Sequence, residues 1–341
     1  MAHHRVVRIA AALVVGSAII AGCTTGGAST APSASAAAGS EAPASGAPAS
    51  GAPASGATGE AVTIGVTFPI LDQFLQTVAD GMEEKAAELG NVELTIVAAE
   101  EDTATQLGQV ENFVTQGVDA IVVIPVDTDA AAPMTAVAQA ADIPLVYVNR
   151  RPSDLPSGVP YVGSDSLYAG TVEMQELAKL ANGQGNVVIL IGDPANEAAV
   201  LRTQGCKDVV AQNPGMTVTK EQAGNWYREE GLSIMENWLQ SGDQIDVVCA
   251  NNDEMALGAI QALKNANKLD QVLVGGVDAT ADALAAMQAG ELEVTVFQDA
   301  QGQGGGGVES AVTLANGGTV PDLIDIPYVL VTPANMAEYM N

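Results

Sequence analysis

Histidine is almost absent from this sequence. Its 341 residues include two, His3 and His4, both at the extreme N-terminus. If that segment is removed from the working protein, no imidazole remains, and Ser-His-Asp catalysis, Cys-His catalysis and His-ligated metal sites are excluded together. The sequence therefore predicts no metal site, and much enzyme chemistry is ruled out.

Basic residues are also scarce, with 12 Lys and Arg against 41 Asp and Glu, which gives a net charge of −29. Proteins bind the phosphate backbone through clustered Lys and Arg, and none cluster here, so we expect no nucleic-acid partner. The same acidity argues against adsorption to an anionic membrane surface. Aromatic residues make up only 4% of the chain, so each one near a possible site carries weight.

Residues 1–22 have the layout of an export signal. Arg5 and Arg8 are followed by an apolar run from Ile9 to Gly22, which is shorter than the roughly 18 residues needed to span a membrane. The run ends in Ile-Ala-Gly before Cys23, which resembles the bacterial lipobox. We expect an exported lipoprotein anchored to the outer face of the cell membrane by lipid on Cys23. The alternative is an ordinary cleaved signal with an incidental cysteine.

Residues 24–60 contain only Thr, Gly, Ala, Ser, Pro and Glu, and APASG occurs three times between Ala42 and Gly56. No side chain here is large and apolar enough to form a core, so residues 23–60 are predicted to be a lipidated cysteine followed by a disordered tether.

From residue 61 the chain alternates apolar β-rich runs with amphipathic stretches of helical length. The predicted strands are 61–68, 92–99, 120–126, 144–149, 186–192, 216–222, 246–251, 271–277 and 294–298. Near-continuous apolar strands separated by helices are typical of parallel sheets covered on both faces. A polar stretch at 150–166 precedes a fresh series, so we predict an α/β fold of two doubly wound parallel-sheet lobes.

In such sheets a ligand lies beyond the carboxyl ends of the strands. The residues there are amides, carboxylates, guanidiniums and a few aromatics, namely Asp72, Phe74, Asp127, Asn149, Arg150, Asn225, Trp226, Arg228, Asn252, Asp253, Asp278, Gln298 and Asp299. They contain no nucleophile–base pair, and they suit a ligand that carries many hydroxyls. Strand-end acids also cap helices, which is the favoured role for Asp165 and Asp253. Trp238 has helical apolar spacing and is expected in the core.

Two long segments carry a family resemblance, NNDEMALGAIQALKNA at 251–266 and VLVGGVDATADALAAMQAGELEVTVFQDA at 272–300. With VNRRP at 148–152 and EAAVLRTQG at 197–205, they resemble the periplasmic sugar-binding proteins of ABC transporters, of the ribose/galactose type. YVNRRP, NW-x-R and VFQDA look most like binders of inositol-type cyclitols and rhizopine. The resemblance covers residues 61–341.

The resemblance implies a type I periplasmic-binding-protein fold, with two lobes joined by three hinge crossings and closing over one ligand. It places the N-terminal lobe at 61–164 plus 299–323 and the C-terminal lobe at 165–298 plus 324–341. The residues that it implies at the ligand are Asp72, Phe74, Asn149, Arg150, Arg202, Trp226, Asn252, Asp278 and Gln298. Its partners would be a small polyhydroxylated ligand and an ABC permease, and we expect a monomer.

Two positions depart from the ribose-binding pattern. Asn149 stands where ribose binders have Asp, and Leu75 stands where they carry a second adjacent aromatic. One charged acceptor and one stacking face are missing, and a site built for particular hydroxyls rejects analogues that lack them. We therefore expect a ligand other than ribose.

Two other signals have competing explanations. Gly302-Gln-Gly304-Gly-Gly-Gly307 matches the dinucleotide-binding pattern G-x-G-x-x-G, but small residues that let a helix pack closely explain it better, so no cofactor is expected. Cys206 and Cys249 fall in apolar contexts and are expected to be separate core thiols, although export permits a disulfide.

Three functions agree with the sequence. The first is a lipid-anchored receptor that delivers a sugar or cyclitol to an ABC importer. The second is the same fold used as a sensor that presents its ligand to a membrane receptor. The third is an exported glycoside hydrolase with paired carboxylates, because only those survive the loss of histidine. The first is favoured, so we predict a binding protein and not an enzyme.

Overall fold

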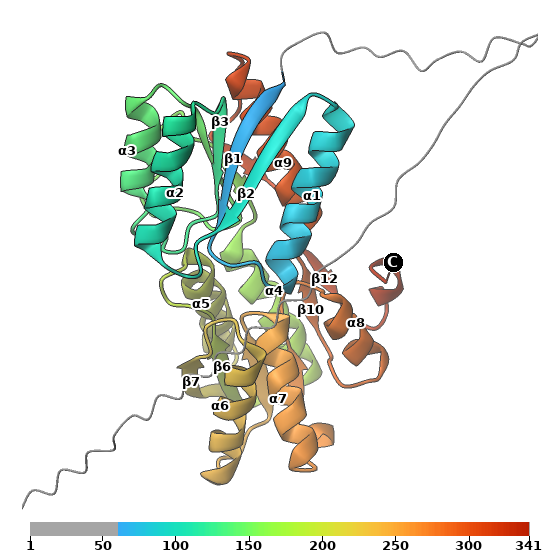
Figure 1. Cartoon of the computed structure of the whole chain (residues 1–341). Helices are drawn as coiled ribbons and strands as arrows, with labels where there is room; N and C mark the ends of the chain where they lie inside the picture. The colour runs from blue at the N-terminus through green and yellow to red at the C-terminus, as the bar shows by residue number, and fades with distance from the viewer. Residues whose placement is uncertain (1–60, 341) are drawn as a thin grey trace, which may run out of the picture. The chain divides into compact units, whose positions relative to one another are not determined.

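A computed structural model describes residues 61–340 (Figure 1), and the predicted signal peptide, the lipidated Cys23 and the tether lie outside them. The strands are β1 (Val62–Phe68), β2 (Val92–Ala98), β3 (Ala120–Val123), β4 (Leu145–Val148), β5 (Tyr161–Gly163), β6 (Gln184–Ile191), β7 (Gly215–Ala223), β8 (Val247–Ala250), β9 (Leu273–Gly275), β10 (Thr295–Phe297), β11 (Leu323–Asp325) and β12 (Val329–Val331). The helices are α1 (Gln73–Leu89), α2 (Thr103–Gln116), α3 (Ala132–Ala140), α4 (Ser166–Leu180), α5 (Glu197–Gln212), α6 (Arg228–Gln240), α7 (Asp253–Asn265), α8 (Ala281–Gln288) and α9 (Ala300–Ala315). Across residues 61–340, no helix combines the length and the apolar character that a membrane span requires.

The strands form two parallel sheets that belong to two lobes. The first sheet has the order β11-β5-β4-β3-β1-β2, and the second has the order β7-β6-β8-β9. An isolated bridge between Gly275 and Val294 continues the second sheet toward β10, which pairs antiparallel with β12. The chain passes between the lobes three times, after β5, after β10 and after β11. These three crossings form the hinge.

Helices cover both faces of each sheet. In the first lobe α1 packs against α9 on one face, and α2 lies beside α3 on the other (Figure 1). In the second lobe the corresponding pairs are α4 with α5 and α6 with α7. The central strands between them, such as β3 and β8, are fully buried. This explains why they are apolar along their whole length, and it confirms the predicted fold class.

The first strand of each lobe lies between the second and the third. β1 is flanked by β2 and β3, and β6 is flanked by β7 and β8. The strand order therefore reverses direction at β1 and at β6, and the crevice outside the carboxyl end of such a strand is where doubly wound sheets bind ligands.

All nine predicted strands are present, but β5, β11 and β12 were not predicted. Each has three residues, and β5 lies within the polar stretch at 150–166. Because β11 pairs with β5, residues 324 and 325 belong to the sheet of the first lobe. The predicted boundary after residue 323 is therefore wrong by two residues.

The glycine-rich segment 302–307 lies inside α9 and packs closely against α1. A Cβ atom on Gly304 would overlap the carbonyl of Val78, and one on Gly81 of α1 would overlap the backbone of Gln301. Only glycine allows the two helix backbones to approach this closely. Close helix packing, as predicted, is therefore the role of this segment.

Cys206 of α5 and Cys249 of β8 are joined in a disulfide, with their Cα atoms 6.8 Å apart. The expectation of two separate thiols is therefore wrong. Both residues are fully buried in one hydrophobic cluster, where α5 packs on the sheet. The sequence indicates that each cysteine is in the core, but it does not indicate the distance between them.

Candidate functional site

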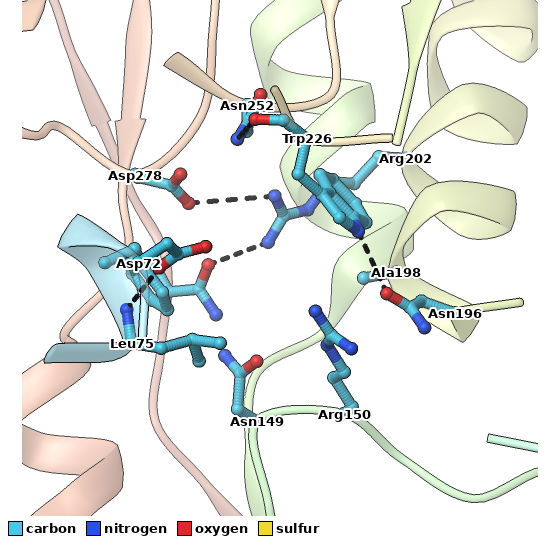
Figure 2. Close-up of a pocket in the computed structure, with 12 residues that line it drawn as sticks. Asp72, Leu75, Asn149, Arg150, Asn196, Ala198, Arg202, Trp226, Asn252 and Asp278 are labelled. Carbon is cyan, nitrogen blue, oxygen red and sulfur yellow. Dashed lines mark hydrogen bonds and ion pairs between the residues drawn. The ribbon is translucent and has the colours of Figure 1, made fainter. Parts of the chain in front are cut away.

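A pocket lies between the lobes at the carboxyl ends of the strands (Figure 2). Its walls are formed by Asp72, Phe74, Leu75, Asn149, Arg150, Asn196, Ala198, Arg202, Trp226, Asn252, Asp278 and Gln298. The empty space between these side chains is about 460 Å³, a figure that includes the part open to solvent. All nine predicted ligand residues line it, and Leu75, Asn196 and Ala198 join them.

Asp72 and Phe74 enter the pocket from the start of α1. Asp72 is the N-cap of this helix, and its Oδ1 accepts a hydrogen bond from the backbone N of Leu75 at 2.7 Å. Burial raises the pKa of the Asp72 carboxyl above its ordinary value, although this hydrogen bond and the charge of Arg150 oppose the rise. Asp72 thus positions the helix with one oxygen, and its second oxygen is left for a ligand.

Arg150 follows β4 and is buried, with 7% of its surface exposed. Nη1 donates to the carbonyl oxygens of Pro125 and Val126 at 3.2 and 3.3 Å. Within residues 61–340, no carboxylate lies within ion-pair distance of Arg150, and its Nε and Nη2 donate to no protein acceptor. Arg150 therefore offers charged donors to the pocket.

Arg202 of α5 is also buried, but the protein surrounds it with acceptors. Nη1 donates to the carbonyl of Asn251 at 2.7 Å. Nη2 donates to Oε1 of Gln298 at 2.7 Å and to the hydroxyl of Tyr328 at 2.6 Å. Nη1 also lies 3.7 Å from Oδ1 of Asp278. Arg202 therefore fixes the side chains of Gln298 and Asp278, which both line the pocket.

Trp226 forms one wall of the pocket from the second lobe. Its ring lies 5.7 Å from the guanidinium of Arg202, and its Nε1 donates to Oδ1 of Asn196 at 2.9 Å. The ring packs against Gly192, where a Cβ atom would overlap it. Nδ2 of Asn252 donates to the carbonyl of Trp226 at 3.1 Å and holds its backbone. The indole is therefore held in one orientation, as a stacking surface for the apolar face of a ring requires.

Three pocket residues have left-handed backbone conformations. The φ angles are 64° at Asn149, 75° at Trp226 and 124° at Asp278. Such angles are uncommon for residues other than glycine, and for a bulky residue such as Trp they are outliers. Strained backbones of this kind cluster at functional sites, where the surrounding structure holds them.

The pocket is balanced in charge. It contains two carboxylates, Asp72 and Asp278, and two guanidiniums, Arg150 and Arg202. Burial raises the pKa of Asp278 well above its usual range, and the nearby Arg202 opposes that rise. The formal charges of these four side chains cancel. The arrangement therefore suits a neutral ligand that both donates and accepts hydrogen bonds.

Some strand-end residues that the sequence singled out lie elsewhere. Arg228 pairs with Glu254 and Asp282 at the partly exposed start of α6, away from the pocket lining. Asp165 caps α4, as predicted. Asp253 is not a cap, because Asn252 takes that position on α7.

The carboxylate of Asp253 instead accepts hydrogen bonds from N of Thr280 at 2.8 Å and from Oγ1 of Thr295 at 2.7 Å. It thereby ties α7 to the hinge side of the second sheet. Trp238 lies in the core of the second lobe, as predicted.

The sequence pattern did not identify Asn196 as a pocket residue or Tyr328 as a support for Arg202. Asn196 follows β6, so the rule applied to the other strand ends would have found it. Tyr328 lies between β11 and β12, two strands that were not predicted.

A model of the periplasmic binding protein domain matches residues 64–319. The chain belongs to the periplasmic binding protein family. A putative rhizopine-binding protein of Rhizobium meliloti is 48% identical over 286 residues, which are 82% of this chain and 93% of that protein. A xylitol-binding protein of Mycolicibacterium smegmatis is 37% identical over 255 residues, 74% of this chain and 72% of that protein.

Among solved structures, an ABC transporter solute-binding protein of Bacillus halodurans with bound myo-inositol is 45% identical, with a TM-score of 0.80, and the match covers 84% of this chain and 99% of that one. These relatives are binding proteins and not enzymes, so this periplasmic binding protein is a solute-binding protein of the ABC-transporter type. The family is extracytoplasmic. Neither the hydrolase nor the sensor is favoured by these relatives.

Proposed function

We propose that this protein captures a neutral cyclitol between its two lobes and delivers it to an ABC permease, with myo-inositol as the first candidate. The ligand-binding residues are the nine predicted ones, from Asp72 and Phe74 of the first lobe to Gln298 at the hinge. The protein acts as a monomer at the outer face of the cell membrane, exported and anchored by lipid on Cys23.

The observation that carries this proposal is the charge-balanced pocket, in which Arg150 has free donors and Arg202 holds Asp278 in place. A phosphorylated sugar would bring two negative charges into this pocket, so its charge balance supports a neutral polyhydroxylated ligand. The names of the similar proteins, which include binders of rhizopine, xylitol and myo-inositol, support a polyol.

The test is calorimetric titration of residues 24–341 with myo-inositol, D-ribose, D-galactose and xylitol. We expect saturable binding of myo-inositol with a micromolar or tighter Kd, which corresponds to about 8 kcal/mol. The inositol should be recovered unchanged from the protein. Preference for D-ribose or D-galactose would contradict the cyclitol assignment, and no binding of any of the four would contradict the proposed function.

A further inference from the structure

Three hydrogen bonds join the two lobes away from the hinge in the part of the chain that the structure describes. Nδ2 of Asn196 donates to the carbonyl of Val126 at 3.0 Å. The backbone N and Oγ1 of Thr128 donate to the carbonyl of Ala195 at 3.1 and 3.0 Å. Val126 and Thr128 follow β3 of the first lobe, and Ala195 and Asn196 follow β6 of the second. We call these four residues the interlobe contact.

Asn196 does not use its side chain in the ordinary local way. It is the N-cap residue of α5, yet its side chain accepts no hydrogen bond from the first turn of that helix. Asparagine at this position usually stabilises a helix through such a bond. The fully buried amide of Asn196 instead points away from its own helix, with both of its polar atoms bonded to other elements.

The two partners of this amide are parts of the pocket. Oδ1 of Asn196 accepts from the indole of Trp226, and Nδ2 reaches the carbonyl of Val126. The same carbonyl accepts from Nη1 of Arg150 at 3.3 Å. One amide therefore links the aromatic wall of the second lobe to the acceptor that holds the free arginine of the first lobe (Figure 2 labels Asn196, Trp226 and Arg150).

We propose that Asn196 is a positioning residue that couples Trp226 to lobe closure. The hydrogen bonds of the interlobe contact form only when the lobes are together, so they favour the closed form without touching the solute. A contact made in one form alone shifts the population toward that form and raises the apparent affinity. This inference rests on the proposed function, because closure over a solute is part of it.

Thr128→Val tests the contact outside the pocket. Valine has nearly the shape of threonine and removes one of the three hydrogen bonds, and Thr128 does not line the pocket. The probe is myo-inositol. For Thr128→Val we expect the Kd and the dissociation rate of myo-inositol to rise on the order of three-fold. For Asn196→Ala we expect both to rise on the order of ten-fold, and in both variants the association rate should change little. Val200→Ala, at an exposed position of α5, is the matched control and should bind like the wild type.

Asn196→Asp separates coupling from a merely structural role. At pH 8 the carboxylate still accepts from Trp226 but cannot donate to Val126. At low pH the protonated acid regains a donor, so its loss of affinity relative to the wild type should shrink as the pH falls. A wild-type Kd and dissociation rate for Thr128→Val, or a loss in Asn196→Asp that is the same at every pH, would overturn the proposal.

Failure of the proposed function is distinguishable from failure of this inference. If the wild type does not bind myo-inositol, the proposed function is wrong. The interlobe contact can still be measured without solute, from hydrogen exchange of the Thr128 amide, which donates across the lobes. Asn196→Ala should speed this exchange several-fold and leave that of Ile124, which bonds within its own sheet to Thr67, unchanged. Equal exchange of Thr128 in both proteins would overturn the inference.

Discussion

The two lobes share one strand order but hold their pocket arginines in opposite ways. Arg202 of the second lobe is surrounded by acceptors from Asn251, Gln298 and Tyr328, with Asp278 nearby. Arg150 of the first lobe has backbone partners for Nη1 alone. One face of the pocket is therefore already hydrogen-bonded within the protein, whereas the other keeps donors that a solute must satisfy.

The second lobe is also the more constrained of the two around the pocket. The disulfide between Cys206 and Cys249 ties α5, which carries Arg202, to β8, which precedes Asn251 and Asn252. The first lobe contains no cysteine between residues 61 and 164. We expect substitutions in the second lobe to affect stability and substitutions at Arg150 to affect binding.

The largest effect is expected from Arg202→Met. It leaves Asp278 buried without its cation and removes the donor from Gln298, Tyr328 and the carbonyl of Asn251. Breaking a buried ion pair in this way costs about 3–5 kcal/mol. Urea unfolding should show a loss of this size, and calorimetry should detect no binding. Wild-type stability in this variant would remove the distinction between the lobes.

Removal of the disulfide comes next. The disulfide closes a loop between two residues that are 43 positions apart, and a Cys206→Ala, Cys249→Ala double variant loses this cross-link. We expect the free energy of unfolding to fall by about 2–4 kcal/mol. The affinity for myo-inositol should stay close to that of the wild type, because neither cysteine lines the pocket. A variant that unfolds like the wild type would show that this constraint is not important.

Arg150→Met should show the opposite pattern. Losing a charge-assisted hydrogen bond costs about 1.5–3 kcal/mol, so the Kd should rise roughly 10- to 100-fold. The free energy of unfolding should fall much less than in Arg202→Met, because the carbonyls of Pro125 and Val126 lose a donor but no buried carboxylate loses an ion-pair partner. Arg228→Met is the matched control, since Arg228 pairs with Glu254 and Asp282 outside the pocket, and it should keep the wild-type Kd.

A further prediction concerns the pH dependence of stability and Asp253 of the second lobe. Burial raises the pKa of this carboxyl from 3.8 to about 7. The folded state therefore binds the proton more tightly, and this stabilising contribution is complete below pH 4 and lost as the pH rises toward 7. Asp253→Asn cannot titrate, so its free energy of unfolding should fall less over this range. Urea unfolding at several pH values checks this, and identical slopes would contradict the pKa shift.

Local sequence pattern predicted the strand ends but not their partners. Apolar runs ending in Asp72, Asn149 or Asp278 identified pocket residues because every parallel strand delivers its carboxyl end to one edge. The same rule included Arg228, since a strand end does not reveal that Glu254 and Asp282 lie within reach. Three contacts join residues that are distant in sequence. They are the disulfide, the hydrogen bond from Arg202 to Tyr328 and the hydrogen bond from Asn196 to Val126. Those pairings depend on packing, which a single sequence does not display.

The most direct test is a crystal structure of residues 24–341 with myo-inositol bound. We predict a closed pocket in which Nε or Nη2 of Arg150 lies within about 3.2 Å of a hydroxyl of the solute. Arg202 should keep its hydrogen bonds to Asn251, Gln298 and Tyr328. A solute that is bound without contact to Arg150, or only after Arg202 has exchanged those partners for the solute, would contradict it.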